Sequence, residues 1–334
     1  MLALLLAALV LQPYADPVLA FSFTDPRISE SSGLVSSSTT DGIVFTHNDS
    51  GDLARFFAVD ATGRTVTTYD LPDVQARDWE DLARGPDEQG RSSLWLGDIG
   101  DNNARRDNGL LVHRIAEPVV DGAREQVTTE APTSFRLRYE DGPGDAEALL
   151  VHPRTGRLYV VTKPLAGPAQ VYAAPPVLDP DGPNELVRVG EVQVRQTGTP
   201  GGPGIGAFAQ LLITAGDVAP DGSRVALRTY TDLYEWPVVG DDLAAAMEGE
   251  PTVTPLPPTR QGEGLAYSAD GRSILTSTEG VGAPVHRLTA VAPVAAPESP
   301  ERSPAAVATS VLLALLVVGA VLAGRRRRRL VTRR

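Results

Sequence analysis

A short motif recurs five times between residues 21 and 290, and it constrains the fold more than any other feature of the chain. In each copy a polar link leads into a strand that carries leucine or valine, and a turn with glycine follows. The copies are residues 30–34 (ESSGL), 78–82 (DWEDL), 145–149 (DAEAL), the looser 214–218 (TAGDV) and 261–265 (QGEGL). The turn glycines stand 48, 66, 66 and 49 residues apart. The repeat predicts five similar units built from short strands.

The rest of this region also favours strands over helices. Helical periodicity is nearly absent, and the one helix candidate is Asp241–Glu248. Four-stranded units at a period of about 50 to 65 residues describe a β-propeller, in which each sheet buries its faces against its neighbours. We therefore predict an all-β fold, a β-propeller of five blades. Six blades, or a pair of β-sandwiches, are the alternatives.

The two ends of the repeat region complement each other. The last unit lacks an outer strand after residues 284–290, whereas Phe21–Asp25 stands in the outer-strand position at the other end. We expect Phe21–Asp25 to close the ring by pairing with the final blade. Such pairing removes an open sheet edge that would otherwise promote aggregation.

The C-terminal segment predicts a membrane anchor. Residues 305–324 contain no charged side chain, and twenty residues of helix span the hydrocarbon core of a bilayer, which is about 30 Å thick. Five arginines follow at 325–329, and arginine next to a span stays on the cytoplasmic side. We expect one transmembrane helix with a cytoplasmic tail at 325–334. A buried core helix is the alternative.

The N-terminal segment predicts export. Residues 2–11 form an apolar run too short to span a membrane, and Val18 and Ala20 offer the small residues of a signal-peptidase site. An apolar strand is the competing interpretation. The predicted organisation is a signal peptide at 1–20, an extracytoplasmic domain at 21–290, a Pro/Ala-rich stalk at 291–304, and the anchor. The protein would be a single-pass protein of the cell membrane.

Composition excludes several classes of function. The chain has no cysteine, so thiol chemistry and Cys-ligated zinc are impossible. Its net charge is −12, and without the seven arginines of 325–334 it has 23 basic against 42 acidic residues. So acidic a domain argues against nucleic acid as a partner and is compatible with cation binding.

The repeat places acidic residues at equivalent inner-strand positions. Glu80, Glu147 and Glu263 align, and Asp78 and Asp145 stand two residues before the first two. Side chains two apart on a strand share a face, so these carboxylates would converge in the channel of a propeller. Crowded carboxylates require a cation or protons. The alternative is a structural role, in which they accept hydrogen bonds from the backbone of adjacent blades.

Two loops rich in oxygen donors follow the next strands. Residues 47–52 (HNDSGD) and 97–102 (GDIGDN) occupy matching positions, and Ca²⁺ takes six to eight such hard oxygen ligands. The same residue types also form ordinary turns. The candidate Ca²⁺ ligands are Asp49, Glu80, Asp98, Asp101, Asn102, Glu147 and Glu263.

Cationic side chains stand at the equivalent tips of later units. Lys163 is the only lysine of the chain, and Arg228 with Tyr230 follows one unit later. These three could bind an anionic ligand such as phosphate or carboxylate, or could pair with the neighbouring acids. Catalytic motifs such as Gly-x-Ser-x-Gly and His-Glu-x-x-His are missing from the sequence.

The segments 76–83 (ARDWEDLA), 96–102 (LGDIGDN) and 112–118 (VHRIAEP) resemble a family of bacterial secreted or membrane-anchored propeller proteins described as WD40-like, whose function is largely unassigned. More distantly, 263–266 (EGLA) is similar to an inner-strand motif of phytase-like esterase and lactonase propellers that use calcium.

We expect a cell-envelope module that binds a small anionic ligand or an envelope protein, with a calcium site at the channel mouth. A calcium-dependent hydrolase of a phosphoester or lactone is the alternative, with Glu80, Glu147, Asp98 and Asp101 around the ion. A protein-interaction scaffold with an empty channel is a third reading.

Overall fold

The computed structural model describes residues 13–106 and 108–291. Within these residues the regular secondary structure is almost entirely β-strand, with two short helices, η1 (Gly206–Leu211) and α1 (Leu243–Met247). The helix candidate Asp241–Glu248 is confirmed as α1, and its first turn is capped by the Asp242 side chain, which accepts a hydrogen bond from the Ala245 amide.

The strands form antiparallel groups of four in chain order. The first group is β2 (Ser31–Ser36), β3 (Val44–Asn48), β4 (Arg55–Val59) and β5 (Thr65–Asp70). The second is β6 (Asp81–Pro86), β7 (Ser92–Asp98), β8 (Leu110–Ala116) and β10 (Thr133–Tyr139). The third is β11 (Ala146–Val151), β12 (Leu158–Thr162), β13 (Ala169–Ala173) and β14 (Pro183–Val192). The fourth is β15 (Ile213–Val218), β16 (Arg224–Thr229), β17 (Asp232–Pro237) and β18 (Thr252–Pro255).

The last group is completed by the N-terminal strand. It contains β19 (Gly262–Tyr267), β20 (Ser273–Thr278), β21 (Pro284–Thr289) and β1 (Val18–Ser22). Two parallel contacts link groups: β9 (Gln126–Thr128) pairs with β5, and β10 pairs with β14.

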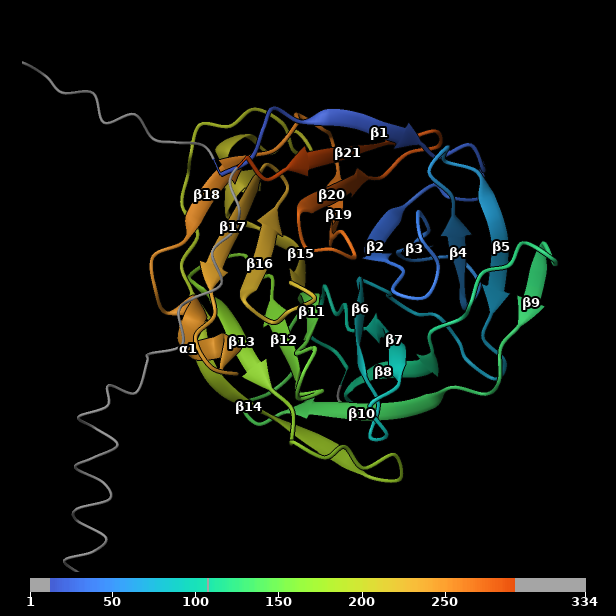
Figure 1. The fold of residues 1–334 in the computed structure, drawn as a ribbon. Helices are drawn as coiled ribbons and strands as arrows, with labels where there is room; N and C mark the ends of the chain where they lie inside the picture. Colours follow the sequence, from blue (N-terminus) through green and yellow to red (C-terminus); the bar gives the residue numbers. More distant parts are fainter. Residues whose placement is uncertain (1–12, 107, 292–334) are drawn as a thin grey trace, which may run out of the picture. The chain divides into compact units, whose positions relative to one another are not determined.

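The first strands of the groups lie at the centre of a ring. Strand β2 contacts β6 and β19, β6 contacts β11, β11 contacts β15, and β15 contacts β19 (Figure 1). The turn glycines of the repeat all adopt the left-handed conformation, with φ between 68 and 76°. A side chain at φ of this sign is strained, which explains why glycine marks the turn of each unit. The prediction of an all-β, propeller-like fold is confirmed.

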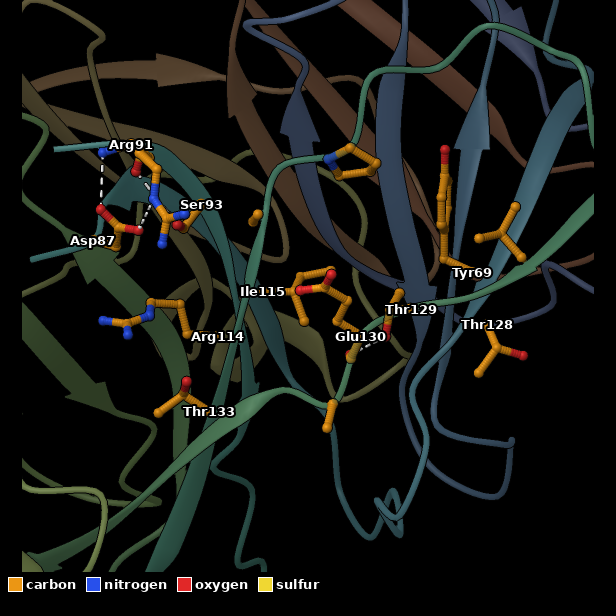
Figure 2. A pocket seen from close by; sticks show the side chains of 14 residues that line it. Tyr69, Asp87, Arg91, Ser93, Arg114, Ile115, Thr128, Thr129, Glu130 and Thr133 are labelled. Atoms are coloured by element: carbon orange, nitrogen blue, oxygen red, sulfur yellow. Dashed lines mark hydrogen bonds and ion pairs between the residues drawn. The ribbon is translucent and has the colours of Figure 1, made fainter. Parts of the chain in front are cut away.

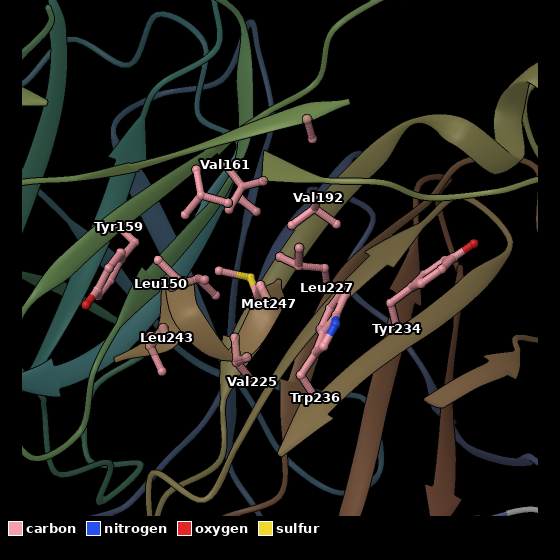
Figure 3. Close-up of a cluster of buried hydrophobic side chains, with 14 of the residues drawn as sticks. Leu150, Tyr159, Val161, Val192, Val225, Leu227, Tyr234, Trp236, Leu243 and Met247 are labelled. Atoms are coloured by element: carbon pink, nitrogen blue, oxygen red, sulfur yellow. The ribbon is translucent and has the colours of Figure 1, made fainter. Parts of the chain in front are cut away.

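The hydrophobic core lies between neighbouring sheets. The cluster in Figure 3 joins the third and fourth groups, with Val161 and Leu227 from facing sheets and Met247 from α1. Fully burying a side chain of this size stabilises the fold by about 1.5–3 kcal/mol. The inner strands β2, β11 and β19 are buried along their whole length, so their polar residues must have a structural or functional reason to be there.

The N-terminal strand closes the last sheet, three residues earlier than predicted. Strand β1 pairs antiparallel with β21 from Val18 to Ser22, whereas Phe21–Asp25 was expected. The ordered contacts extend further back, since the buried Tyr14 hydroxyl lies 3.0 and 3.1 Å from the two carboxylate oxygens of Glu235. Cleavage after Ala20 would remove Tyr14 and most of β1.

Other predictions about the termini lie outside the described residues. These are the apolar part of the signal peptide, the stalk beyond residue 291, the transmembrane helix at 305–324 and the arginine-rich tail. In residues 13–106 and 108–291, no helix has both the length and the apolar character needed to cross a bilayer.

Candidate functional site

Irregular pairing at the start of the inner strands directs acidic side chains to one place. The register between β11 and β12 slips between Ala146 and Ala148, which brackets Glu147. The register between β19 and β20 slips between Gly262 and Leu265, which brackets Glu263. A bulge of this kind releases a residue from the ladder and turns its side chain.

The carboxylates gather in two groups that share one residue. Asp49, Asp78 and Glu80 each offer an oxygen within 4.8 Å of the others, and so do Glu80, Asp145 and Glu147. Glu80, Glu147 and Glu263 are 2%, 3% and 4% exposed. The predicted convergence of Glu80 and Glu147 with Asp78 and Asp145 is therefore present in the structure.

Burial and mutual repulsion raise the pKa values of these groups. Burial, with nearby Glu147 and Asp78, raises the pKa of Asp49 to about 8. Burial raises the pKa of Glu147 to about 7, although Lys163 opposes the shift. Burial and the neighbouring carboxylates raise the pKa values of Glu80 and Glu263 well above the usual range. Two of the oxygens, Asp49 Oδ1 and Glu263 Oε2, are buried without a hydrogen-bond partner.

Lys163 and Tyr230 border the acids as predicted. The Lys163 ammonium donates hydrogen bonds to Glu147 Oε1 at 2.7 Å and to the Tyr230 hydroxyl at 3.0 Å. Burial alone would lower the Lys163 pKa, but Glu147, Tyr230 and Glu263 together outweigh burial and hold it above its usual value. Burial raises the pKa of Tyr230 to about 12, so its hydroxyl keeps its proton at neutral pH.

Asp98 and Asp101 lie in neither carboxylate group of the described residues. Asp98 forms a 2.6 Å ion pair with Arg106 and accepts a hydrogen bond from the Asp78 amide at 3.1 Å. Asp101 accepts hydrogen bonds from the amides of Arg105 and Arg106 at 2.9 and 2.8 Å. Both residues brace the loop after β7, so their oxygens are already engaged.

The loop after β7 packs closely against the carboxylates of Asp78 and Glu80. A Cβ at Gly100 would lie 2.7 Å from Asp78 Oδ2 and would overlap Glu80 Oε1, so a larger residue there would displace these carboxylates. Burial raises the pKa of Asp78, and a hydrogen bond from the exposed Asn102 of the same loop opposes this shift in part.

Arg228 is directed away from solvent. It is 1% exposed and donates hydrogen bonds to the carbonyl oxygens of Gly264 at 2.7 Å and Ser277 at 3.1 Å. Burial lowers its pKa to about 10. The guanidinium thus links β16 to β19 and β20, which gives Arg228 a structural role. Its role in anion binding stays a prediction.

Sequence reasoning missed the residues that do tie the inner strands together. The fully buried Asp81 accepts hydrogen bonds from the amides of Leu149 on β11 at 2.9 Å and Gly216 on β15 at 3.1 Å. Asp217 accepts one from the Tyr267 amide on β19 at 2.7 Å. The signal was available, because both aspartates directly precede the leucine or valine of the repeat.

A separate cavity lies away from these acids. It measures about 420 Å³ and is bordered by Tyr69, β8 and the segment around β9 (Figure 2). Arg91 in its wall is paired with Asp87 at 2.7 Å, and Arg114 is paired with Glu88. The arginines that border this cavity are thus paired with acidic side chains, whereas the carboxylates of the two groups face one another.

Comparison with known proteins adds information on the fold only. No protein-family model and no curated protein matches the chain. Among solved structures, a gluconolactonase from Xanthomonas campestris is 12% identical, with a TM-score of 0.45 over 84% of this chain and 99% of that one. A glutaminyl cyclase from Myxococcus xanthus is 16% identical, with a TM-score of 0.42 over 83% of this chain and 97% of that one. The resemblance to WD40-like envelope proteins stays a prediction.

Proposed function

We propose that this protein binds a divalent cation on the two carboxylate groups at the starts of the inner strands and after β3, with Ca²⁺ as the expected ion, and that the loaded site binds a small ligand. The observation that carries the proposal is the pair of carboxylate groups that share Glu80, with oxygens within 4.8 Å of one another. Several buried carboxylates in so small a space repel one another unless protons or a cation neutralise them.

The residues present fit a hard cation. Every residue of the two groups is a carboxylate, and Ca²⁺ prefers oxygen ligands. Asp49 Oδ1 and Glu263 Oε2 are buried without partners, so both can accept a metal contact without losing a hydrogen bond. The residues that would hold the ion are those of the two groups, Asp49, Asp78, Glu80, Asp145 and Glu147. Glu263 lies in neither group, but Glu147 and Asp49 act on its pKa, so it would be a further ligand. Asp98 and Asp101 would support the loop rather than coordinate.

Lys163 would contribute the ligand contact. Its ammonium has three donors, of which Glu147 and Tyr230 take two. The third could hold an anionic group of a ligand next to the cation. Arg228 has no comparable freedom, because backbone carbonyls surround its guanidinium.

A second candidate function is hydrolysis of a phosphoester or lactone. It is favoured by Glu147, whose pKa of about 7 suits proton transfer at neutral pH. A bound divalent cation would supply polarisation of the bond to be cleaved. Glu147 would then accept or donate the proton, and the paired Lys163 would orient it.

Metal analysis of the purified full-length protein tests the proposal. We expect about one divalent ion per chain after dialysis against Ca²⁺, and its loss together with a lower melting temperature after treatment with a chelator. A protein that holds no ion and does not respond to Ca²⁺ would leave the acids with a structural role. Hydrolysis of phosphoester and lactone substrates by the loaded protein separates the two functions.

We also propose five blades and a place at the cell envelope. Five copies of the motif and five inner strands support the blade number. The apolar segment 305–324 with its arginines supports a membrane anchor and an outward-facing propeller. Proteolysis of intact cells tests the orientation, since protection of the whole chain would contradict it.

A further inference from the structure

The cavity of about 420 Å³ in Figure 2 lies between the first and second groups of strands. Tyr69 on β5 and residues 127–131, in and after β9, border it on one side. Arg91, in the turn before β7, and Arg114 on β8 border it on the other. None of the described residues that line it belongs to the two carboxylate groups. This volume accommodates a small organic molecule.

The two arginines keep hydrogen-bond donors that a ligand can reach. The Arg91 side chain is 69% exposed, and its Nε donates to Asp87 Oδ2 at 2.7 Å. The Arg114 side chain is 13% exposed, pairs with Glu88 through Nη1 and lies over the Trp95 ring at 5.1 Å. A guanidinium has five N–H donors, so a single carboxylate partner leaves several of them free. This wall can therefore hold an additional anionic group.

An unpaired carboxylate lies across the cavity from these arginines. Glu130 follows β9 and is exposed, and Figure 2 shows it on the opposite side from Arg91 and Arg114. Its backbone oxygen accepts a hydrogen bond from the Thr129 hydroxyl at 2.8 Å, but within residues 13–106 and 108–291 its carboxylate has no partner. The cavity thus has cationic donors on one wall and a free carboxylate on the other.

This distribution of charge selects among classes of ligand. A simple anion would be attracted by the arginines but repelled by Glu130, and a simple amine would meet the reverse conditions. A molecule with both charges satisfies both walls, since hydrogen bonds between ionised groups are the strong ones. The wall also contains the side chains of Tyr69 and Ile115, which are 5% and 8% exposed, and of Val127. These favour a ligand that has an apolar part as well.

We propose that this cavity binds a small zwitterion, an α-amino acid with an apolar side chain. Arg91 and Arg114 would donate to its carboxylate, and Glu130 would accept from its ammonium group. Its side chain would pack against Ile115 and Val127. This inference goes beyond the divalent-cation site and does not require it.

Calorimetric titration of the full-length protein with three probes tests the inference. The probes are L-leucine, isoamylamine, which is leucine without its carboxylate, and isocaproate, which is leucine without its ammonium group. We expect leucine to bind, and each of the other two to bind roughly tenfold more weakly because one charged contact is lost. The affinities should be the same in Ca²⁺ and in EDTA.

Two variants assign the charged contacts. Glu130→Gln should weaken leucine roughly tenfold without weakening isocaproate, which has no ammonium group. Arg91→Gln should weaken leucine to a similar extent without weakening isoamylamine, which has no carboxylate. Both side chains are exposed, so Tm should stay at the wild-type value. The matched control is Arg272→Gln, on an exposed turn before β20, which should change none of the affinities.

Three results would overturn the inference. Absence of leucine binding would exclude the site. Equal affinity for the three probes, or for the wild type and both variants, would mean that the charges of the cavity do not recognise the ligand. Leucine that binds only with Ca²⁺ present would lie at the carboxylate groups instead. Failure of the Ca²⁺ proposal is distinguishable, because it leaves the titrations in EDTA unchanged.

Discussion

Replacement of Glu80 by glutamine gives opposite results for a cation site and for a structural tie. Glu80 belongs to both carboxylate groups and is buried, and glutamine keeps its size but removes its charge. In the wild type, Ca²⁺ at one hundred times its Kd stabilises the folded state by about 2.7 kcal/mol. For a domain of this size, each kcal/mol raises Tm by about 2–4 °C, so we expect a rise of about 5–10 °C.

The variant should differ in two ways. Loss of the shared charge weakens Ca²⁺ binding, so saturating Ca²⁺ should raise Tm by less than about 2 °C. Without the ion, the variant should be at least as stable as the wild type, because the repulsion with Glu147 and Asp49 is gone. A structural tie predicts the reverse, since removal of its charge would lower stability whether or not Ca²⁺ is present.

Thermal unfolding of the two proteins in Ca²⁺ and in EDTA measures both effects. The matched control is Glu125→Gln, on an exposed segment before β9, which should behave as the wild type in both buffers. Our reasoning fails if Glu80→Gln keeps the full Ca²⁺ response. It fails equally if the ion-free variant unfolds several degrees below the ion-free wild type.

Three other predictions follow from the geometry. Asp81→Ala removes the acceptor of three buried amides, so denaturant unfolding should show a loss of about 2–5 kcal/mol, and a loss below about 1 kcal/mol would contradict the tie. Removal of residues 13–20 takes away most of β1 and the Tyr14 contact, so it should lower Tm clearly, and an unchanged Tm would mean that closure does not need them. The raised pKa values of Asp49 (about 8) and Glu147 (about 7) stabilise the ion-free fold at low pH. This stability should disappear as pH rises through 7 and 8 while Ca²⁺ affinity increases, and a flat ion-free profile of Tm between pH 6 and 9 would contradict it.

The repeat predicted the fold because its signals are local. A left-handed glycine in each turn and the apolar strand after it are properties of a few adjacent residues. The start of strand β1 was harder to predict from the sequence. Val18 and Ala20 suit both a peptidase site and an edge strand, and only the pairing with β21 distinguishes the two patterns.

The roles of Asp98, Asp101 and Arg228 depend on contacts that the sequence does not encode locally. The Asp98 carboxylate is engaged because the chain returns at Arg106 to form a buried ion pair. Arg228 is engaged because glycines on the neighbouring inner strand leave room for a guanidinium; a Cβ at Gly262 would overlap it. No count of donors along the chain distinguishes such residues from free ligands.

Glu80 and Asp81 show how adjacent acids acquire different roles. Consecutive residues on a strand face opposite sides, so Glu80 meets other carboxylates while Asp81 meets backbone amides. Burial raises the pKa of both well above the usual range, so a shifted pKa does not separate them. The hydrogen bonds that each carboxylate accepts do separate the two roles. Asp81 accepts amide bonds from three residues and has little capacity left for a cation, whereas Glu263, at the position equivalent to Glu80, keeps one buried oxygen unmatched. An unmatched buried oxygen of this kind is what a divalent ion can use.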